Sequence, residues 1–290
     1  MCMKRIVIIL TTGLCLLAMI LFGTKVSESA KEGVDLCIRV VIPSLFPFFV
    51  VSSYLNGQLS SIPIPFLRSI ENLCRMPKNS GAIFILGLLG GYPVGAQSIA
   101  EQYENGTLSR QDAQRLLGFC NNAGPAFLFG MLSAFFPSTY HLWAMWGIQI
   151  VSAFLTGILL PGKAAGCCSP RFSCSITVPK ALERSVRSIL LVCGWVILFR
   201  VILSPVSDIP LLSGIIELTN GCMQLNAIPS IRIRFILASM YLSFGGLCVH
   251  MQTLSVANGL DLKYYLGGKL LQTVITMILS ALVAFTVPNL

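Results

Sequence analysis

Apolar runs of about twenty residues recur along the whole chain, and short polar or charged stretches separate them. The runs lack the regular alternation of apolar and polar residues that strands of a β-barrel show, so they predict membrane-spanning helices. The pattern indicates an all-α polytopic membrane protein. We expect about seven full spans, at 6–23, 36–55, 116–136, 142–160, 188–206, 235–257 and 269–287.

Two further apolar segments are too short to cross a bilayer. The first, Gly81–Gly91, has the sequence GAIFILGLLGG and is interrupted by glycine and proline. At about 1.5 Å per residue its apolar part crosses less than half of a core that is roughly 30 Å thick. The second, Leu211–Gly221, has the sequence LLSGIIELTNG and turns polar where apolar residues would have to continue. We expect both segments to form re-entrant hairpins.

The basic residues support this topology. Placing the N-terminus inside and both short segments as re-entrant puts fourteen Lys and Arg residues inside, five outside and Arg200 within a span. If the first short segment crossed fully, the basic stretch 161–187 would lie outside, against the positive-inside rule. The inside residues are Lys4, Arg5, Arg68, Arg75, Lys78, Arg110, Arg115, Lys163, Arg171, Lys180, Arg184, Arg187, Lys263 and Lys269; the outside residues are Lys25, Lys31, Arg39, Arg232 and Arg234.

This topology contains a repeat of pattern, without detectable identity between its halves. Residues 36–160 and 188–287 each contain a span, a re-entrant segment and two further spans, and the two units start on opposite sides. Inverted repeats with interrupted segments at corresponding positions point to a transporter site near the bilayer midplane. We therefore divide the chain into an N-terminal transmembrane helix (1–30), a first repeat (31–160), a basic cytoplasmic linker (161–187) and a second repeat (188–290).

The first 30 residues allow a second interpretation. Lys4 and Arg5 precede an apolar run, and the sequence SESA follows it, as in a secretory signal peptide. The cleavage site is poor and membrane-embedded sequence follows it, so we favour an uncleaved first helix.

Composition removes several classes of function. The chain is 55% hydrophobic and 11% charged, whereas soluble domains carry roughly 25% charged residues. The net charge of +9 comes from short loops between spans, so we expect contact with membrane lipid and no nucleic-acid partner. Eleven cysteines occur without a CxxC pair, mostly within apolar segments, which is typical of small buried hydrophobes. We expect no metal site and no cofactor.

The first predicted hairpin and the span after it each contain a break. Freed backbone groups at membrane depth find partners only in protein or in a water-filled cavity. Broken helices can also present dipole ends to a bound ion or substrate. We expect substrate-binding residues at both breaks, although the glycines could serve close packing and the asparagines could link helices. The candidates are Gly90, Gly91, Tyr92, Pro93, Asn121, Asn122 and Gly124.

The second half has matching breaks. Glu217 is the one acidic residue within an apolar segment, and a buried carboxylate in a membrane needs a partner or a task. We assign it to coupling with a proton or cation, with a structural pairing to Arg200 as the alternative. His250 is equally consistent with a satisfied core histidine and with a ligand. The substrate-binding candidates of this half are Thr219, Asn220, Gly221, Gly245, Gly246, His250 and Gln252.

Between the first two breaks lies a polar stretch that predicts an exposed helix–turn–helix connector. Asn105 and Gly106 form the turn, and Ser109 can cap the next helix, with Asp112 in a capping-box-like position.

With these residues identified, the chain resembles the sporulation integral membrane protein YlbJ family, which belongs with the nucleoside-recognition, or Gate-type, membrane domains. The resemblance implies an endospore-forming bacterium, a role in sporulation and a transport-like fold in the cell membrane. It also implies a small anionic aromatic solute similar to dipicolinate. The matching stretches are Ser29–Leu55, Gly90–Ala96 (GGYPVGA), Tyr103–Phe127 (containing FCNNAGP), Leu212–Gly221, Phe244–Leu254 and Tyr264–Gln272.

Three functions were compared. A secondary transporter for a small solute accounts for the repeat, the breaks and the resemblance. A non-transporting membrane scaffold or subunit of a spore-envelope complex is the alternative, and a homo-oligomer or a complex with sporulation membrane proteins stays open. We expect no enzyme and no catalytic residues, because HExxH and GxSxG motifs and His/Cys clusters are absent from the sequence.

Overall fold

A computed structural model describes residues 2–59, 67–162, 176–204, 210–257 and 259–287 of the chain. Every regular element in these ranges is helical. Five of the described helical stretches are long and apolar enough to cross a membrane. They are Gly23–Leu55, Thr139–Leu159, Val178–Leu203, Ile231–Val256 and Lys263–Thr286. The fold is that of an all-α, multi-pass membrane protein.

Two of the seven predicted spans differ from this set. The span predicted at 6–23 lies in α1 (Cys2–Leu21), in which the described apolar stretch is only Thr12–Leu21. The span predicted at 116–136 is divided, because its helix stops before the asparagine pair and restarts at Pro125. A count of seven therefore stays a prediction.

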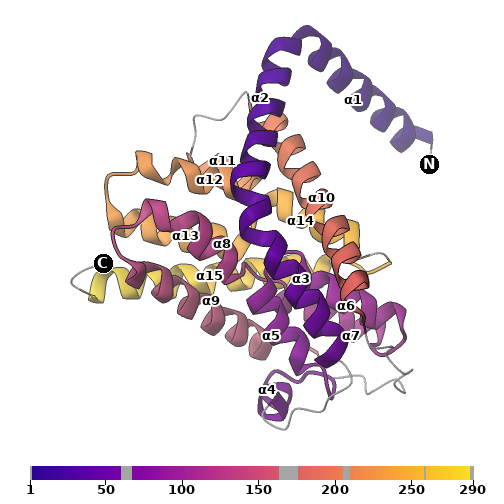
Figure 1. Cartoon of the computed structure of the whole chain (residues 1–290), viewed down its shortest axis with the longest axis vertical. Helices are drawn as coiled ribbons and strands as arrows, with labels where there is room; N and C mark the ends of the chain where they lie inside the picture. Colours follow the sequence, from indigo (N-terminus) through magenta and orange to yellow (C-terminus); the bar gives the residue numbers. More distant parts are fainter. Residues whose placement is uncertain (1, 60–66, 163–175, 205–209, 258, 288–290) are drawn as a thin grey trace.

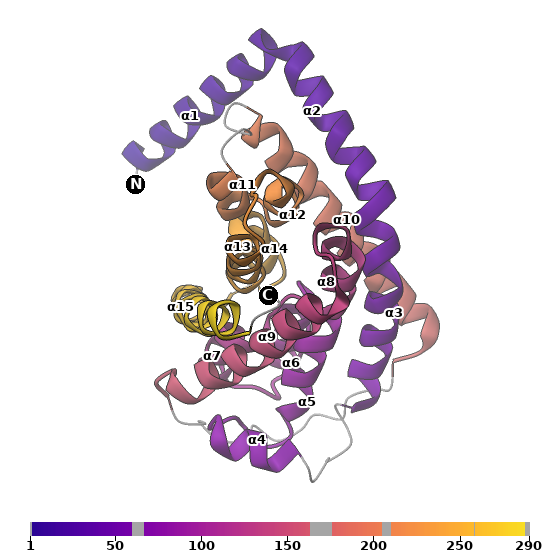
Figure 2. The same ribbon diagram turned by 90° about the vertical axis from the view of Figure 1, so that its left-hand side faces the viewer.

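A long helical rod opens the folded part of the chain. It consists of α2 (Gly23–Leu36), the π-helical turn η1 (Cys37–Val41) and α3 (Ile42–Leu59). Helix α10 (Val178–Leu203) packs along this rod, while α1 projects away from the other helices in both views (Figures 1 and 2). Many large apolar side chains of α1 are exposed, as expected of a surface that faces lipid.

The first predicted repeat continues with short helices that break at the predicted positions. Helices α5 and α6 form a hairpin, α7 and α8 form a broken helix, and α9 is a full-length span. The elements are α4 (Leu67–Leu73), α5 (Gly81–Gly90), α6 (Val94–Glu104), α7 (Arg110–Cys120), α8 (Pro125–Met131), the 3₁₀ turn η2 (Leu132–Phe135) and α9 (Thr139–Leu159).

The second predicted repeat has the same order of elements. After α10 come a short hairpin, a broken helix and a full-length helix. These elements are α11 (Pro210–Ile216), α12 (Leu218–Met223), the 3₁₀ turn η3 (Gln224–Ala227), α13 (Ile231–Phe244), α14 (Gly246–Val256) and α15 (Lys263–Thr286).

The stretch predicted as a linker, 161–187, is partly helical. Residues 163–175, including Cys167 and Cys168, lie outside the described part of the chain. Helix α10 begins at Val178, because Pro179 suits the first turn of a helix and good helix-forming residues follow it. The last ten residues of the predicted linker are therefore the first turns of a spanning helix.

The broken helices pack around α15, which runs along α7, α9 and α13 (Figure 2). This arrangement brings the last helix of the second repeat against the first repeat. The two predicted repeats therefore share one core, and neither forms a separate bundle among the described residues.

Two arginines, one buried and one partly buried, donate to backbone carbonyls at opposite ends of the bundle. Arg115, in α7, donates to the carbonyl oxygens of Cys74 and Gly157 at 2.7 Å each. These contacts place the chain before α5 beside the start of α7, so the α5–α6 hairpin enters and leaves at one end. Arg234, in α13, donates to the carbonyls of Phe135 and Ile228 at 2.8 Å each.

The connector between α6 and α7 is the predicted helix–turn–helix, but its exposure is largely confined to the turn, since Gln102, Leu108 and Asp112 are buried. Gly106 has a φ of 71° in the turn, and nothing lies near the position of an added methyl group. The Ser109 hydroxyl accepts a hydrogen bond from the Asp112 backbone at 3.1 Å and caps α7.

Candidate functional site

All fifteen residues predicted to bind substrate or couple an ion are buried in the structure. They lie at four helix breaks, at the ends of α5, α7, α11 and α13, or in the first turns of the helices that follow. A buried helix break is stable only where its free backbone N–H and C=O groups have hydrogen-bond partners. The contacts that provide these partners define the geometry of the candidate site.

The two breaks of the first repeat touch each other through their backbones. Gly91 has φ 77° and ψ −174°, a conformation that is essentially restricted to glycine. A methyl group added to Gly91 would lie 2.8 Å from the Gly124 nitrogen, and one added to Gly124 would lie 2.8 Å from the Gly91 nitrogen. The close approach of the two backbones therefore requires glycine at both positions. This supports the interpretation that these two glycines serve close helix packing.

The breaks of the second repeat also meet. A methyl group on Gly246, whose φ is 73°, would lie 3.2 Å from the Gly214 oxygen and from the Leu218 nitrogen. Gly221 packs against Gly214 within the α11–α12 hairpin. In each repeat, the hairpin break is thus held against the break of the following helix.

Glu217 caps the second helix of its hairpin. One carboxylate oxygen accepts a hydrogen bond from the Thr219 backbone at 2.9 Å, and the other accepts one from the Asn220 backbone at 2.7 Å. The side chain is 2% exposed. A carboxylate at a helix N-terminus is stabilised by these N–H groups and by the helix dipole. This capping role was not anticipated from the sequence.

Arg200 has other partners than the one considered for it. Its guanidinium forms an ion pair with Glu32 at 2.7 Å and donates to the side-chain oxygen of Asn220. No ion pair joins Arg200 to Glu217 within the described residues. The predicted alternative, a direct structural pairing of these two charges, is therefore wrong, because the carboxylate faces the helix that it caps.

Tyr92 joins the two repeats. Its hydroxyl lies 3.2 Å from the Leu242 carbonyl and 3.3 Å from the Ser243 carbonyl, to which it donates. Both carbonyls belong to the last turn of α13, where the break at Gly245 leaves them without their usual helical partners. Tyr92 in the first repeat thus satisfies backbone groups freed by a break in the second.

A small cavity lies where these breaks meet. Its volume is about 40 Å³, enough for water-sized groups but far below the roughly 300 Å³ of a typical ligand pocket. Four predicted site residues line it: Tyr92 from the first repeat, and Glu217, Thr219 and Gln252 from the second. We call this space the core cavity. Its other walls are Val41, Leu45, Phe127, Val192, Val196, Leu218 and Val249.

A buried lysine lies behind Tyr92 and was missed by the sequence analysis. Lys269 is 0% exposed and donates to Asn122 Oδ1 at 3.1 Å, Gln272 Oε1 at 2.8 Å and the Tyr92 hydroxyl at 3.3 Å. Its assignment to an inside loop is wrong, because α15 begins six residues earlier, at Lys263.

A signal for this lysine is present in the sequence. Polar side chains recur along one face of α15 at spacings of three or four residues, and every one of them is fully buried. Such a polar stripe facing the protein interior is typical of functional membrane helices. The stripe consists of Tyr265, Lys269, Gln272, Thr276 and Ser280.

Asn121 and Asn122 have different partners. Asn121 donates to Thr253 Oγ1 at 2.9 Å and accepts from the Ala96 backbone at 3.3 Å, so it links α6, α7 and α14. Asn122 lies beside Lys269 and donates to the Phe119 carbonyl at 2.7 Å. Neither asparagine lines the core cavity. Both asparagines link helices, and the Asn122 side-chain oxygen also accepts a hydrogen bond from Lys269.

His250 belongs to α14, as does Thr253, which accepts the Asn121 hydrogen bond. Its Nδ1 is 2.9 Å from the Tyr265 hydroxyl, and its ring packs edge-on against Phe244 and Tyr265. The described residues contain no cluster of three or more His, Cys, Asp or Glu side chains able to hold a metal ion.

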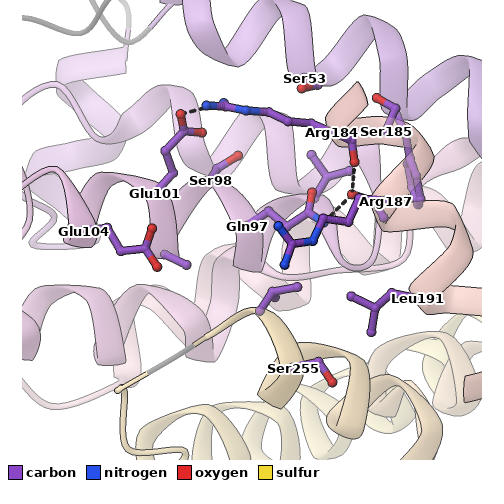
Figure 3. A pocket seen from close by; sticks show the side chains of 15 residues that line it. Ser53, Gln97, Ser98, Glu101, Glu104, Arg184, Ser185, Arg187, Leu191 and Ser255 are labelled. Atoms are coloured by element: carbon purple, nitrogen blue, oxygen red, sulfur yellow. Dashed lines mark hydrogen bonds and ion pairs between the residues drawn. The ribbon is translucent and has the colours of Figure 1, made fainter. Parts of the chain in front are cut away.

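A larger cavity of about 290 Å³ lies between α3, α6, α10 and α14 (Figure 3). Arg184 crosses it to form an ion pair with Glu101 at 2.6 Å, and Gln97 donates to the Ser188 hydroxyl. We call this cavity the vestibule. It is lined by Phe49, Ser53, Val94, Gln97, Ser98, Ala100, Glu101, Glu104, Arg184, Ser185, Arg187, Ser188, Leu191, Ser255 and Val256.

The vestibule and the core cavity follow one another along the same helices. On α10, Val196 and Val192 line the core cavity, and Leu191 to Arg184 line the vestibule. On α3 and α14 the order is the same, with Leu45 and Gln252 at the core cavity. The vestibule lies at the end of these helices that the basic residues predict to be inside. Phe49 and Val94, both buried, line the vestibule on the side nearest the core cavity.

Comparison with known proteins gives one relationship over most of the chain. The sporulation integral membrane protein YlbJ of Bacillus subtilis (strain 168) is 27% identical to it over an alignment of 311 positions, which covers 85% of this chain and 74% of that protein. No protein-family model matches the chain, and the comparison with solved structures found no match.

Proposed function

Because the chain belongs to the family of the sporulation integral membrane protein YlbJ, we propose that it is a secondary transporter that moves a small solute during sporulation. The observation that carries the proposal is the core cavity, at which a hairpin break from each repeat is exposed to the same buried space. Interrupted helices that meet near the middle of a bundle are how many transporters build a binding site.

The order of elements supports an inverted repeat. Each half contains a long helix, a short hairpin, a broken helix and a second long helix. In our proposal the α5–α6 and α11–α12 hairpins are re-entrant from opposite sides of the membrane. The ten residues of α5 span about 15 Å, half of the hydrocarbon thickness. The arginine contacts at opposite ends of the bundle, by Arg115 and Arg234, fit this opposed orientation.

The polar groups at the breaks suit an anionic solute. Helices α8 and α14 each begin at a break without a capping side chain, so their positive dipole ends face the core. Helix α6 also has no cap of its own, but its Ala96 N–H group already donates to the Asn121 side-chain oxygen. The buried ammonium of Lys269 adds positive potential behind Tyr92. A small aromatic dianion similar to dipicolinate would match this charge, and Tyr92 and Gln252 would contact it.

Glu217 is our proposed coupling group. Its carboxylate lines the core cavity, and the hydrogen bonds from α12 hold it in place. A proton or monovalent cation bound to this carboxylate would change the charge that a solute meets in the core cavity. The hydrogen bonds and the coupling role are compatible, because a carboxylate has about four acceptor positions.

Transport would require the core cavity to widen. A volume of about 40 Å³ cannot hold an aromatic solute, whereas the vestibule is close to the size of known ligand sites. We propose that the structure represents a closed state in which Phe49 and Val94 separate the two spaces. Movement of the hairpins would connect them, as alternating access demands.

The direct test is flux of radiolabelled dipicolinate into proteoliposomes that contain the purified chain. We expect saturable uptake, its loss in Glu217→Gln, and an increased half-saturation concentration in Tyr92→Phe. Tyr54→Phe, at an exposed tyrosine, is the matched control and should behave as wild type. Wild-type flux in Glu217→Gln would remove the coupling role. A folded protein without flux that copurifies with another membrane protein would favour the scaffold.

A further inference from the structure

Lys269 is a buried lysine whose amino group donates to neutral oxygens among the described residues. It is fully buried in the middle of the helix bundle, and no described Asp or Glu side chain forms an ion pair with it. A charged side chain in a membrane interior is costly unless polar groups surround it. The three oxygens around its Nζ atom therefore need an explanation.

These oxygens come from three separate elements. Tyr92 belongs to the break of the α5–α6 hairpin, Asn122 to the break between α7 and α8, and Gln272 to α15. Their distances to Nζ are 3.3, 3.1 and 2.8 Å, within or near the range of a good N–H···O hydrogen bond. An ammonium has three donors and no acceptor, so three oxygens satisfy it completely.

The donor groups of the same side chains point elsewhere. The Gln272 amide nitrogen donates to Asn122 Oδ1 at 2.8 Å, and the Asn122 amide nitrogen donates to the Phe119 carbonyl at 2.7 Å. The Tyr92 hydroxyl donates its proton to the end of α13. Only lone pairs remain facing Nζ, and the Tyr92 ring adds a cation–π contact at 5.2 Å.

From this arrangement we infer that Lys269 is a tethered monovalent cation that fills an oxygen-lined cation site between two helix breaks and α15. In transporters, backbone carbonyls of unwound segments coordinate a free cation, and side-chain oxygens take that place here. Here the chain supplies the cation itself, so the contact between these elements does not depend on an ion from solution. The inference does not require that the protein be a transporter.

The first experiment leaves the lysine in place and changes one neighbour. Gln272→Glu puts a carboxylate beside Nζ. Gln149→Glu puts one at an equally buried glutamine, whose amide nitrogen donates, among the described residues, to the Leu242 carbonyl. If Lys269 is charged, the apparent Tm of Gln272→Glu in detergent should stay near or above that of wild type. The apparent Tm of Gln149→Glu should fall by about 5 °C or more. Equal losses in both variants would overturn the inference.

The second experiment deletes the lysine side chain and supplies a free ammonium compound in its place. Lys269→Ala leaves space for n-propylammonium, which replaces the deleted part of the side chain. The variant should have a lower Tm than wild type, and n-propylammonium should restore it in a saturable way. The neutral analogue n-propanol should not, and neither compound should affect the exposed-lysine control Lys180→Ala. Full stability without the amine, or a folded variant that the amine fails to restore, would contradict a cation site.

If Lys269→Ala does not fold, the comparison of the two glutamate variants decides alone. Both experiments measure stability and not flux, so they can succeed when dipicolinate transport fails, or fail when transport is observed. A failure of the proposed function is thereby distinguishable from a failure of this inference.

Discussion

The two hairpin breaks occupy the same place in their repeats but are stabilised differently. The break between α5 and α6 contains Gly90, Gly91, Tyr92 and Pro93, and the first turn of α6 is capped from outside the hairpin, by the Asn121 side-chain oxygen on the Ala96 N–H group. The break between α11 and α12 contains Glu217, whose carboxylate caps α12 through two backbone hydrogen bonds. The first break depends on distant segments of the chain, whereas the second satisfies itself locally.

This difference predicts how far the structural effect of a substitution at each break extends. Gly91 packs against Gly124, and the Tyr92 hydroxyl holds the last turn of α13, so the first break joins three elements. The Glu217 carboxylate acts within its own hairpin. Changes at the first break should therefore affect both halves of the chain, and removal of the Glu217 carboxylate should act mainly on α12 and the core cavity.

The largest effect is expected from Gly91→Ala. Alanine would be strained at φ 77°, and its methyl group would lie 2.8 Å from the Gly124 backbone nitrogen. Backbone strain and overpacking together should cost about 2–5 kcal/mol. Thermal unfolding in detergent should show a large loss of Tm or no folded protein. Gly147→Ala, at an open position in α9, is the control and should be neutral; similar effects at both glycines would refute the close contact.

Glu217→Ala should have the next largest effect. It removes the cap of α12 and leaves two buried N–H groups without a partner, which should cost about 1–3 kcal/mol. Glu217→Gln retains one carbonyl oxygen and should recover part of the loss. Measuring unfolding and dipicolinate flux in both variants separates capping from coupling. A fully stable Glu217→Ala would show that the local cap is unimportant.

Tyr92→Phe should reduce stability moderately, by about 1 kcal/mol, because it removes hydrogen bonds to two carbonyls and to Lys269. Hydrogen exchange should increase in the last turn of α13, although the mutation lies in the other repeat. Tyr54→Phe provides the matched control at an exposed site. If protection were lost only around Tyr92 itself, the connection between the repeats would not be supported.

The smallest effect on stability is expected from Arg184→Ala. This ion pair with Glu101 is partly exposed, and such pairs typically contribute less than about 1 kcal/mol. Removing it should leave Tm nearly unchanged while altering the rate of flux through the vestibule. Glu101→Ala should have the same effect as Arg184→Ala, and the double variant should add nothing further. Independent, additive effects of the two changes would argue against a functional pair.

Much of this fold could be read from the sequence, because length and hydropathy determine which segments can cross a membrane. Glycine, proline and asparagine marked the breaks at Gly91 and Asn121 correctly, since few other residues tolerate interrupted backbone there. The Ser109 cap followed from side-chain chemistry within one turn. The inverted arrangement of the repeats stays a prediction, supported by element order.

The site was less accessible to sequence reasoning, because its contacts join residues far apart in the chain. Lys269 was counted as a loop charge, and only its helix and its neighbours, Tyr92 and Asn122, place it in the core. Glu217 was predicted to couple an ion, with a pairing to Arg200 as the alternative, and its hydrogen bonds to the backbone of α12 were not anticipated.

The sequence by itself determined which segments are long and apolar enough to cross a membrane and where several helices stop, since hydrophobic length and backbone propensity act over a few neighbouring residues. Only the tertiary structure decided which break faces which, and which polar groups satisfy one another. A hydrogen bond between Tyr92 and α13 spans 150 residues of chain, and its energy depends on a distance that no local pattern specifies.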